Sequence, residues 1–531
     1  MKTRITSSSK SVTVAILFFA AIISLHAGTI TVTNTNDSGP GSLRQALADA
    51  NNGDTINFAV TGTIALTSGE LLVDKSITIS GPGADNLAVD ANLKSRVCHI
   101  NTGETVIISG LTIRGGLASG GGGIHNDHAA LTLSNCTIGP NHAIATGGGI
   151  YNNGEHDGGA ILQISSCLIN VNFSQGSGGG ISSDGSLGGG ASLEIDASSI
   201  TNNLANSGGG AIYNTGDSAA TTMNVRTSTL ANNHALDGAA VYNQDATSTL
   251  NNCTIASNGV DDLGAGIYNK GNGNGTAMLT VSNSTLFQNF AAKHSGGGIY
   301  NDGSSLGNAN LQITNSTLSF NSAIESGGAI FNDGQSGGHA SLEIGNSTFN
   351  GNSAGLKDAG IYNLGANGGE AAVLLANTIL NASAATGNII NDSGTVTSSG
   401  YNLSSDDAGG FLTGPGDQID TDPLLGPLQD NGGATVTHEL LNGSPAIDAG
   451  DPSFTPPPFY DQRGPDFFRV RNGRIDIGSF EVQVGSTPSP TPPPTPTPTV
   501  TPTATPTATA TPRLSPTPRT RPTPHHRPTP P

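Results

Sequence analysis

The sequence predicts an all-β fold: a right-handed single-stranded parallel β-helix (a solenoid) of about nine or more coils, capped at both ends and followed by a disordered Pro/Thr-rich tail. Three observations predict it. The composition is rich in Gly and poor in charge, one phrase recurs about every 30 residues, and two columns of Asn keep a fixed place in the repeat. A short unit stacked many times explains all three observations.

Composition and charge exclude several classes of protein. The 531 residues include 75 Gly, about twice ordinary usage, with no Trp and only 11% charged residues, which indicates tight turns joined by short strands. Seven basic residues lie near the two ends, so the body holds 13 Lys and Arg against 39 Asp and Glu. Such a body repels nucleic acid and anionic membranes, so no nucleic-acid partner is expected.

The two ends of the chain differ from the body. Residues 1–27 resemble a secretory signal peptide, with three basic residues before an apolar run from Val12 to Leu25. That run is too short to span a bilayer comfortably, and no second one follows, so no transmembrane span is expected in the mature chain. Residues 486–531 alternate Thr and Pro and can form neither ladders nor a core. We expect an extended spacer there, either a tail without a partner or a wall- or matrix-spanning stalk.

A phrase of two small residues followed by Ile-Tyr-Asn marks the repeat. Nine copies end at Asn126, Asn152, Ser183, Asn214, Asn243, Asn269, Asn301, Asn332 and Asn363. The resulting period of about 30 residues leaves room for roughly three strands with their turns, and it is too short for the four-stranded blade of a propeller.

A second phrase in each period has the pattern of a strand with one buried face. In Leu131–Ile138, Leu279–Leu286 and Leu311–Leu318, aliphatic residues alternate with polar ones. One such coil buries too little apolar surface to fold alone, but a stack of coils shares one continuous core. The outward side of the strand carries Thr132, Gln163, Glu194, Thr280, Gln312 and Glu343.

The second Asn column follows this strand without a gap. Its members are Asn141, Asn172, Asn203, Asn233, Asn258, Asn289, Asn321 and Asn352. If coils stack about 4.8 Å apart, each amide can donate to the next Asn and accept from the previous one, so a buried ladder satisfies itself. Asn also favours left-handed turn geometry, and both explanations predict the same architecture.

Caps are expected at the two ends of the stack. A helix is predicted over residues 42–50, where Leu43, Ala46, Leu47 and Ala50 share one face that could cover the first coil. The expected parts are a signal peptide at 1–27, an N-terminal cap with the first coils at 28–110, β-helix repeats at 111–400, a C-terminal cap at 401–485 and the tail at 486–531.

Several motifs resemble those of bacterial surface proteins. Gly327–Ile330 and Phe349–Asn352 are similar to the paired repeat motifs of polymorphic outer-membrane proteins, which are secreted β-helix proteins. Thr31–Asp37 with Ser42–Arg44 resembles the N-terminal domain named for its Cys-Ser-Leu-Arg-Glu-Ala motif, although the Cys and the Glu of that motif are replaced here.

The longest resemblance is C-terminal, to the choice-of-anchor domain of bacterial surface proteins. The motifs that carry it are Asp422–Pro427, Asp430–Gly433, Thr437–His438, Gly443–Gly450, Asp461–Gly464 and Asp476–Glu481. The resemblance implies an exported β-helix protein at the cell surface or the outer membrane. Only the Pro/Thr tail follows this domain, so the mode of anchoring stays open.

The four Cys predict no metal site. Cys136, Cys167 and Cys253 occupy one inward column in which other coils have Ser, so they are expected to be small core residues. Cys136 and Cys167 fall in adjacent coils, at a spacing that would permit a disulfide. No Cys spacing is typical of zinc.

Paired carboxylates are the first catalytic candidates on a carbohydrate-active β-helix. Glu194 and Glu343 share an outward column but lie about five coils apart, roughly 24 Å, which is too far for one site. Asp261–Asp262 is interpreted as a solvated turn, and few basic residues lie within the coils. The sequence therefore assigns no catalytic, cofactor-binding or metal-binding residue.

Two other groups of residues receive structural interpretations. The Asp that follows the first Asn column is interpreted as turn-forming rather than calcium-binding, because Lys270 and Leu364 replace it in other copies. The turn-forming Asp residues are Asp127, Asp184, Asp302 and Asp333.

Charged residues between 461 and 481 are expected to form ion pairs within the cap.

An aromatic column neighbours the inward Ile of the first phrase and should face outward or line a turn. We expect its rings to stack on one another, with stacking on sugars as the alternative. The column contains Tyr151, Tyr213, Tyr242, Tyr268, Tyr300, Phe331 and Tyr362.

These observations lead to one functional hypothesis and one main alternative. The protein is expected to be an exported non-enzymatic cell-surface or extracellular β-helix protein, acting in adhesion, envelope structure or interaction with glycan or matrix. Extracellular polysaccharide or surface proteins would be its partners, and no cofactor is expected. The alternative is a polysaccharide lyase or glycoside hydrolase on the same scaffold, which would need Asp or Glu together with Arg or Lys in one groove.

Overall fold

A computed structural model describes residues 27–156, 158–217, 220–356, 359–382 and 387–483. The expected Pro/Thr tail, and all but the last residue of the expected signal peptide, lie outside these described residues.

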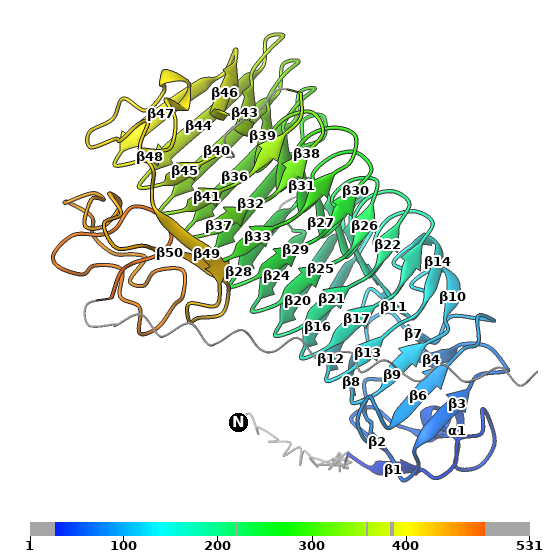
Figure 1. Cartoon of the computed structure of the whole chain (residues 1–531). Helices are drawn as coiled ribbons and strands as arrows, with labels where there is room; N and C mark the ends of the chain where they lie inside the picture. The colour runs from blue at the N-terminus through cyan, green and yellow to red at the C-terminus, as the bar shows by residue number, and fades with distance from the viewer. Residues whose placement is uncertain (1–26, 157, 218–219, 357–358, 383–386, 484–531) are drawn as a thin grey trace, which may run out of the picture. The chain divides into compact units, whose positions relative to one another are not determined.

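Four long parallel sheets wind around one axis, which confirms the predicted parallel β-helix (Figure 1). Sheet A has 14 strands, sheet B 13, sheet C 12 and sheet D nine. Each strand pairs in parallel with its counterpart in the next coil, and like residues face like residues, as at Tyr268 and Tyr300 in sheet C. The rod is therefore one repeated unit stacked in register.

Sheets A and B hold the second phrase of each repeat. Sheet A consists of β1 Thr29–Val32, β2 Thr55–Phe58, β5 Thr78–Ser80, β8 Thr105–Ser109, β12 Ala130–Ser134, β16 Gly159–Ser165, β20 Gly190–Asp196, β24 Thr222–Arg226, β28 Thr247–Asn251, β32 Thr276–Ser282, β36 Asn308–Thr314, β40 His339–Gly345, β44 Glu370–Ala376 and β47 Thr395–Gly400. Sheet B consists of β3 Gly62–Ala65, β6 Leu87–Asp90, β9 Thr112–Arg114, β13 Thr137–Ile138, β17 Leu168–Asn170, β21 Ser199–Thr201, β25 Thr229–Ala231, β29 Thr254–Ala256, β33 Thr285–Phe287, β37 Thr317–Ser319, β41 Thr348–Asn350, β45 Ile379–Asn381 and β48 Leu403–Ser404.

Sheet C holds the first phrase, and sheet D lies between sheets B and C along the chain. Sheet C consists of β4 Leu71–Val73, β7 Cys98–Ile100, β11 Ile124–Asp127, β15 Ile150–Asn153, β19 Ile181–Gly185, β23 Ile212–Gly216, β27 Val241–Gln244, β31 Ile267–Lys270, β35 Ile299–Asp302, β39 Ile330–Asp333, β43 Ala359–Leu364 and β46 Gly387–Asp392. Sheet D consists of β10 Leu117–Gly120, β14 His142–Thr146, β18 Phe173–Ser174, β22 Leu204–Ala205, β26 His234–Ala235, β30 Gly259–Val260, β34 Phe290–Ala291, β38 Ser322–Ala323 and β42 Ser353–Ala354.

The middle coils contain four strands, where the period predicts three. The fourth is a strand of sheet D, and from β18 onward each of these has only two residues. Two residues cannot show an alternating pattern, so the strand cannot be recognised from the sequence.

The main core is one continuous cluster of aliphatic residues inside the coils. Ile150, Ile181 and Ile212 stack in successive coils and are fully buried. Cys136 and Cys167 are free thiols buried in this core, as the inward column predicts. Their column forms a further ladder, in which the N–H of Cys136 donates to Cys167 Sγ and that of Cys167 to Ser198 Oγ.

Both predicted Asn columns form ladders of amide hydrogen bonds. In the second column, Asn258 Nδ2 donates to Asn289 Oδ1 at 2.9 Å and Asn289 Nδ2 to Asn321 Oδ1 at 2.8 Å. The first column is interrupted at Ser183, where Asn152 Nδ2 donates to Ser183 Oγ at 3.1 Å. One coil further, Asn214 Oδ1 is buried without a hydrogen-bond partner.

The N-terminal end of the core is covered by α1, Leu43–Asp49. Ser42 accepts a hydrogen bond from the Gln45 N–H at the start of this helix, which explains why the helix begins there. Leu43 and Leu47 are buried against the first coils, as the apolar face predicts. No helix among the described residues is long and apolar enough to cross a membrane.

The C-terminal segment covers both an end and a side of the stack. The short helix η1, Ala408–Gly410, places Ala408 and Leu412 in the core at the last coil. Residues 425–483, which include the hairpin of β49 Leu425–Gln429 and β50 Thr437–Leu440, instead lie against the outer face of sheet B (Figure 1). Gln462 Oε1 accepts from the Thr317 hydroxyl there, so this part is a lateral cover and not the end cap that the sequence predicts.

The lateral cover contains a buried ion pair, as expected. Arg463 Nη2 lies 2.5 Å from Asp461 Oδ2. Arg469 is fully buried beside Asp476 and Glu481. Burial and the neighbouring Asp476 carboxylate raise the pKa of Glu481 to about 8. This cluster therefore stabilises the cover and is closed to a substrate.

Candidate active site

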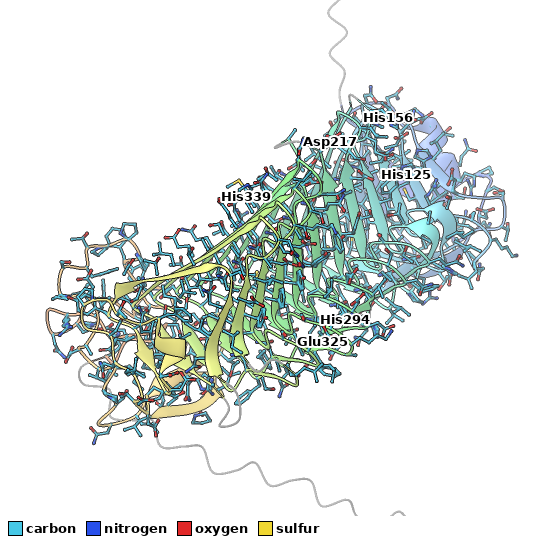
Figure 2. The ribbon with its side chains drawn as sticks, turned by 90° about the horizontal axis from the view of Figure 1, so that it is seen from above. His125, His156, Asp217, His294, Glu325 and His339 are labelled. Carbon is cyan, nitrogen blue, oxygen red and sulfur yellow. The ribbon has the colours of Figure 1, made fainter. Side chains whose placement is uncertain are left out.

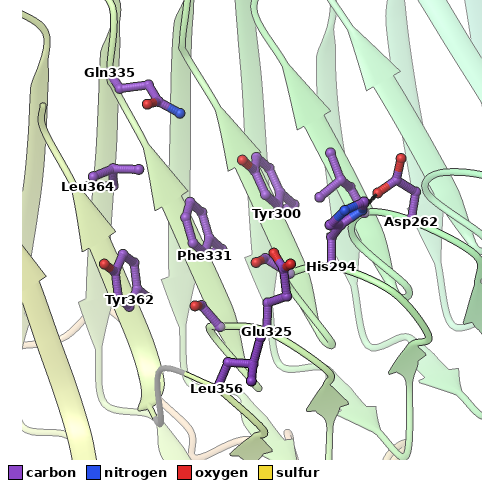
Figure 3. Close-up of a pocket in the computed structure, with 12 residues that line it drawn as sticks. Asp262, His294, Tyr300, Glu325, Phe331, Gln335, Leu356, Tyr362 and Leu364 are labelled. Carbon is purple, nitrogen blue, oxygen red and sulfur yellow. Dashed lines mark hydrogen bonds and ion pairs between the residues drawn. The ribbon is translucent and has the colours of Figure 1, made fainter. Parts of the chain in front are cut away.

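A groove of about 580 Å³ lies over the outer face of sheet C, beside β35, β39 and β43. Its lining residues come from four successive coils, so it follows the axis of the rod (Figure 3). The floor is aromatic, and the two walls are built from the turns before and after the strands of sheet C.

The floor consists of the outward aromatic column. Tyr300 and Phe331 have ring centroids 4.8 Å apart with an interplanar angle of 10°, and Phe331 and Tyr362 have centroids 5.0 Å apart. These rings are only 2–8% exposed because their faces cover one another. Over these three residues the column stacks ring on ring, as expected, and offers ring edges rather than faces to a ligand. Tyr268 instead meets Tyr242 and Tyr300 edge to face.

The first wall is a column of one residue per coil in the turns that join sheet D to sheet C. It contains Asp262, His294, Glu325 and Leu356. The Glu325 N–H donates to the His294 carbonyl at 3.0 Å, and the Leu356 N–H donates to the Glu325 carbonyl at 3.1 Å. The backbone ladder of the solenoid thus holds these side chains in a row along the groove.

A carboxylate orients the imidazole in this row. His294 Nδ1 contacts the Asp262 carboxylate, and Glu325 extends over the groove on the next coil (Figure 3). An imidazole held by a carboxylate is an arrangement that can accept or deliver a proton. Figure 2 shows that His294 and Glu325 lie on the opposite edge of the rod from His339.

Behind the second wall, tyrosine hydroxyls bind carboxylates of the next coil. Tyr268 Oη donates to Asp302 Oδ2 at 2.6 Å, and Tyr300 Oη donates to Asp333 Oδ2 at 2.7 Å. Asp302 and Asp333 are 5% and 2% exposed. Each also accepts a backbone N–H two residues further on, at Ser304 and Gln335, which is the turn geometry expected for these Asp.

Burial shapes the electrostatics around the groove. Desolvation raises the pKa of the Asp333 carboxyl, and burial beside Asp333 raises the pKa of the Tyr300 hydroxyl well above its ordinary value. Burial also raises the pKa of Asp237, whose Oδ1 accepts the Leu263 N–H, to about 6. Lys270 supplies a positive charge here, with Nζ 3.3 Å from Asp302 Oδ2.

The structure brings together residues that the sequence did not group. Glu194 and Glu343 lie on β20 and β40, five pairings apart in sheet A, and form no site. Of the pair interpreted as a solvated turn, Asp262 enters the groove, whereas Asp261 is exposed outside it, 3.8 Å from Lys293 Nζ.

The sequence analysis missed His294 and Glu325. Together with Asp262, they lie four or five residues after Asn289, Asn321 and Asn258 of the second column. That common offset was the available signal. It was obscured because these turns differ in length by one residue, so the three side chains do not align with the repeat.

Comparisons with known proteins bear on the fold. No family model matches the chain, and no curated protein matches it. Solved structures that resemble it include pectate lyase Pel9A, with 13% identity and a TM-score of 0.39 over 86% of this chain and 96% of that one. A PL6 alginate lyase in complex with a trisaccharide is 12% identical, with a TM-score of 0.37 over 79% and 92% of the two chains. A mannuronic acid-specific family 6 lyase from human gut microbiota is 10% identical, with a TM-score of 0.33 over 74% and 92%.

These neighbours correct the functional expectation. They are polysaccharide lyases, so the expectations of a non-enzymatic adhesion or envelope protein and of no enzymatic activity are wrong. At these low identities and TM-scores, the similarity is one of fold alone.

Proposed function

We propose that the protein is a polysaccharide-active enzyme that hydrolyses glycosidic bonds in the groove over sheet C. One observation carries this proposal: Asp262, His294 and Glu325 form a row along an open groove, with the imidazole held by one carboxylate and flanked by a second. Elongated polysaccharide suits a groove that follows the axis of the rod.

The row supplies an acid and a base at a workable separation. Asp262 and Glu325 lie two coils apart, roughly 10 Å along the axis at about 4.8 Å per coil. That backbone spacing lies just above the carboxyl separation of inverting glycosidases, roughly 6.5–9.5 Å, and it leaves room for a water molecule.

In the proposed reaction, His294 and Asp262 take a proton from that water. The water oxygen bonds to the anomeric carbon as the bond to the leaving sugar oxygen breaks, and Glu325 gives its proton to that oxygen. Each product then carries a hydroxyl group, the proton taken up by His294 returns to solvent, and Glu325 takes up a proton from solvent.

A degradation screen tests the proposal. The purified chain is incubated with a panel of soluble polysaccharides, and new reducing ends are measured. We expect release from at least one substrate, with a loss of roughly 10²–10⁴-fold in His294→Gln and in Glu325→Gln. His339→Gln is the matched control, because His339 also pairs with a carboxylate, Glu370, at 3.2 Å on another face.

The screen also separates the possible outcomes. No new reducing ends with any substrate would refute the proposal. Products with the ultraviolet absorbance of a conjugated double bond would replace hydrolysis by elimination, and a loss of activity equal in all three variants would place the chemistry elsewhere.

We further propose that the protein is exported and retained at the cell surface. The signal-like residues 1–27 and the choice-of-anchor-like motifs between 422 and 481 support this location. On this proposal, the polymorphic outer-membrane-type repeats are the scaffold that carries the groove. Fractionation of cells that express the full chain tests it, and a chain found wholly in the cytoplasm would contradict it.

A further inference from the structure

The groove is acidic on both sides. Asp262 and Glu325 belong to its first wall, and Asp302 and Asp333 lie behind the second. Because Asp302 and Asp333 are almost fully buried, solvent screens their charges poorly.

The positive groups nearby are already engaged. Lys270 pairs with Asp302, His294 pairs with Asp262, and Lys293 lies beside the exposed Asp261.

Two carboxyl groups are left without a cationic partner among the described residues. Glu325 reaches into the groove with none, and Asp333 is held by the neutral Tyr300 hydroxyl and Gln335 amide. A ligand therefore meets uncompensated negative charge along this groove.

This charge pattern selects between polysaccharide classes. A polyuronate carries one carboxylate per sugar, and a chain lying along the axis would bring these close to the buried Asp333 carboxylate, where like charges repel strongly. The hydroxyls of an uncharged sugar can instead donate hydrogen bonds to Glu325 and to the Gln335 side-chain oxygen. Its apolar faces can meet Leu356 and Leu364, which also line the groove.

Building on the proposed function, we infer that the substrate is an uncharged polysaccharide and that the groove excludes polyuronates. Charge, and not size, is the selecting property. The polyuronate substrates named for the pectate and alginate lyases of similar fold are therefore not expected for this chain.

Matched ligands test this inference. Binding of the full chain to polygalacturonate and to its methyl ester is measured at low and at high salt, since the two share a backbone and differ in charge. Neutral xylan, mannan and β-glucan complete the set. We expect at least one uncharged ligand to bind, with a preference for the ester over the acid of at least tenfold at low salt that narrows at high salt.

Two variants separate groove charge from general charge. Asp333→Asn should narrow the preference for the methyl ester over the acid severalfold, because it removes a buried charge beside the groove. Glu343→Gln, on sheet A, removes the same charge elsewhere and should leave the preference unchanged. Equal narrowing in both variants would overturn the inference.

The remaining outcomes are distinct for the two proposals. Three outcomes would overturn the inference. They are equal binding of acid and ester, preferential binding of the acid with or without calcium, and binding of no uncharged ligand. Cleavage of a polyuronate alone would leave the hydrolytic site standing but refute the inferred substrate class. Binding of an uncharged polysaccharide without cleavage would support the inference and refute the hydrolytic proposal.

Discussion

Replacing Asn289 by Ala removes one rung from the second Asn column. The Asn289 amide donates to Asn321 Oδ1 at 2.8 Å and to the Ile255 carbonyl at 3.0 Å. Its Oδ1 accepts from Asn258 Nδ2 at 2.9 Å and from the Asn258 backbone N–H at 3.1 Å. All of these bonds are buried, and the substitution deletes them together.

The expected cost follows from the groups that are left behind. Asn258 Nδ2 keeps its bond to the Leu230 carbonyl, and Asn321 Oδ1 keeps the Asn289 backbone N–H. The Asn258 N–H loses its partner in a site closed to solvent. An unsatisfied buried donor costs roughly 1–3 kcal/mol, so we expect the free energy of unfolding to fall by about that amount.

Urea denaturation followed by circular dichroism measures this change, with Asn310→Ala as the control. Asn310 is exposed on β36 of sheet A, and its replacement should change the stability by less than about 0.5 kcal/mol. Equal denaturation midpoints for the two variants would refute the view that the ladder is buried and stabilising.

Three further predictions concern stability. Ser183→Asn should complete the first Asn column, because the new amide can donate to the unpartnered Asn214 Oδ1. We expect it to stabilise the protein by roughly 1 kcal/mol in the same denaturation assay. A destabilised variant would show that the site cannot hold the amide. Cys167→Ser should leave the free energy of unfolding nearly unchanged, because Ser fills this column elsewhere. Cys167→Val should lower it by roughly 1–3 kcal/mol, because the Cys136 N–H loses its hydrogen-bond partner. Equal denaturation midpoints for the two variants would refute a role for that bond. Glu481, with its pKa raised to about 8 from an ordinary 4.5, stays protonated in the folded state while the unfolded chain releases the proton, so stability should fall as pH rises between these values. Glu481→Gln should reduce that fall, and denaturation midpoints measured across this pH range would contradict the assignment if the slope were unchanged.

Much of the scaffold was predictable because its residues repeat. Asn141 to Asn352 recur without a gap, and a polar residue that keeps one place in every coil needs a partner in the next. The inward Cys136 and Cys167 were predictable for the same reason, since alternation fixes which face of a strand is buried.

The groove and the lateral cover were not predictable, because neither repeats. His294 and Glu325 lie in turns of unequal length, so the stacking that joins them is absent from the pattern of residues. Thr285 and Thr317 have an outward place on sheet B and are buried only because Gln462, far along the chain, hydrogen-bonds to their hydroxyls.

The interruption at Ser183 has a mechanical consequence. The hydrogen bonds between coils run along the rod, so a pull on its two ends loads every interface in series, and the weakest one opens first. Where Ser183 stands in place of Asn, the column lacks one amide hydrogen bond, and Asn214 Oδ1 has no hydrogen-bond partner. We therefore expect the interface between the coils of β19 and β23 to open under load more readily than the same interface with an unbroken Asn row, at a distance from the segment that carries the groove.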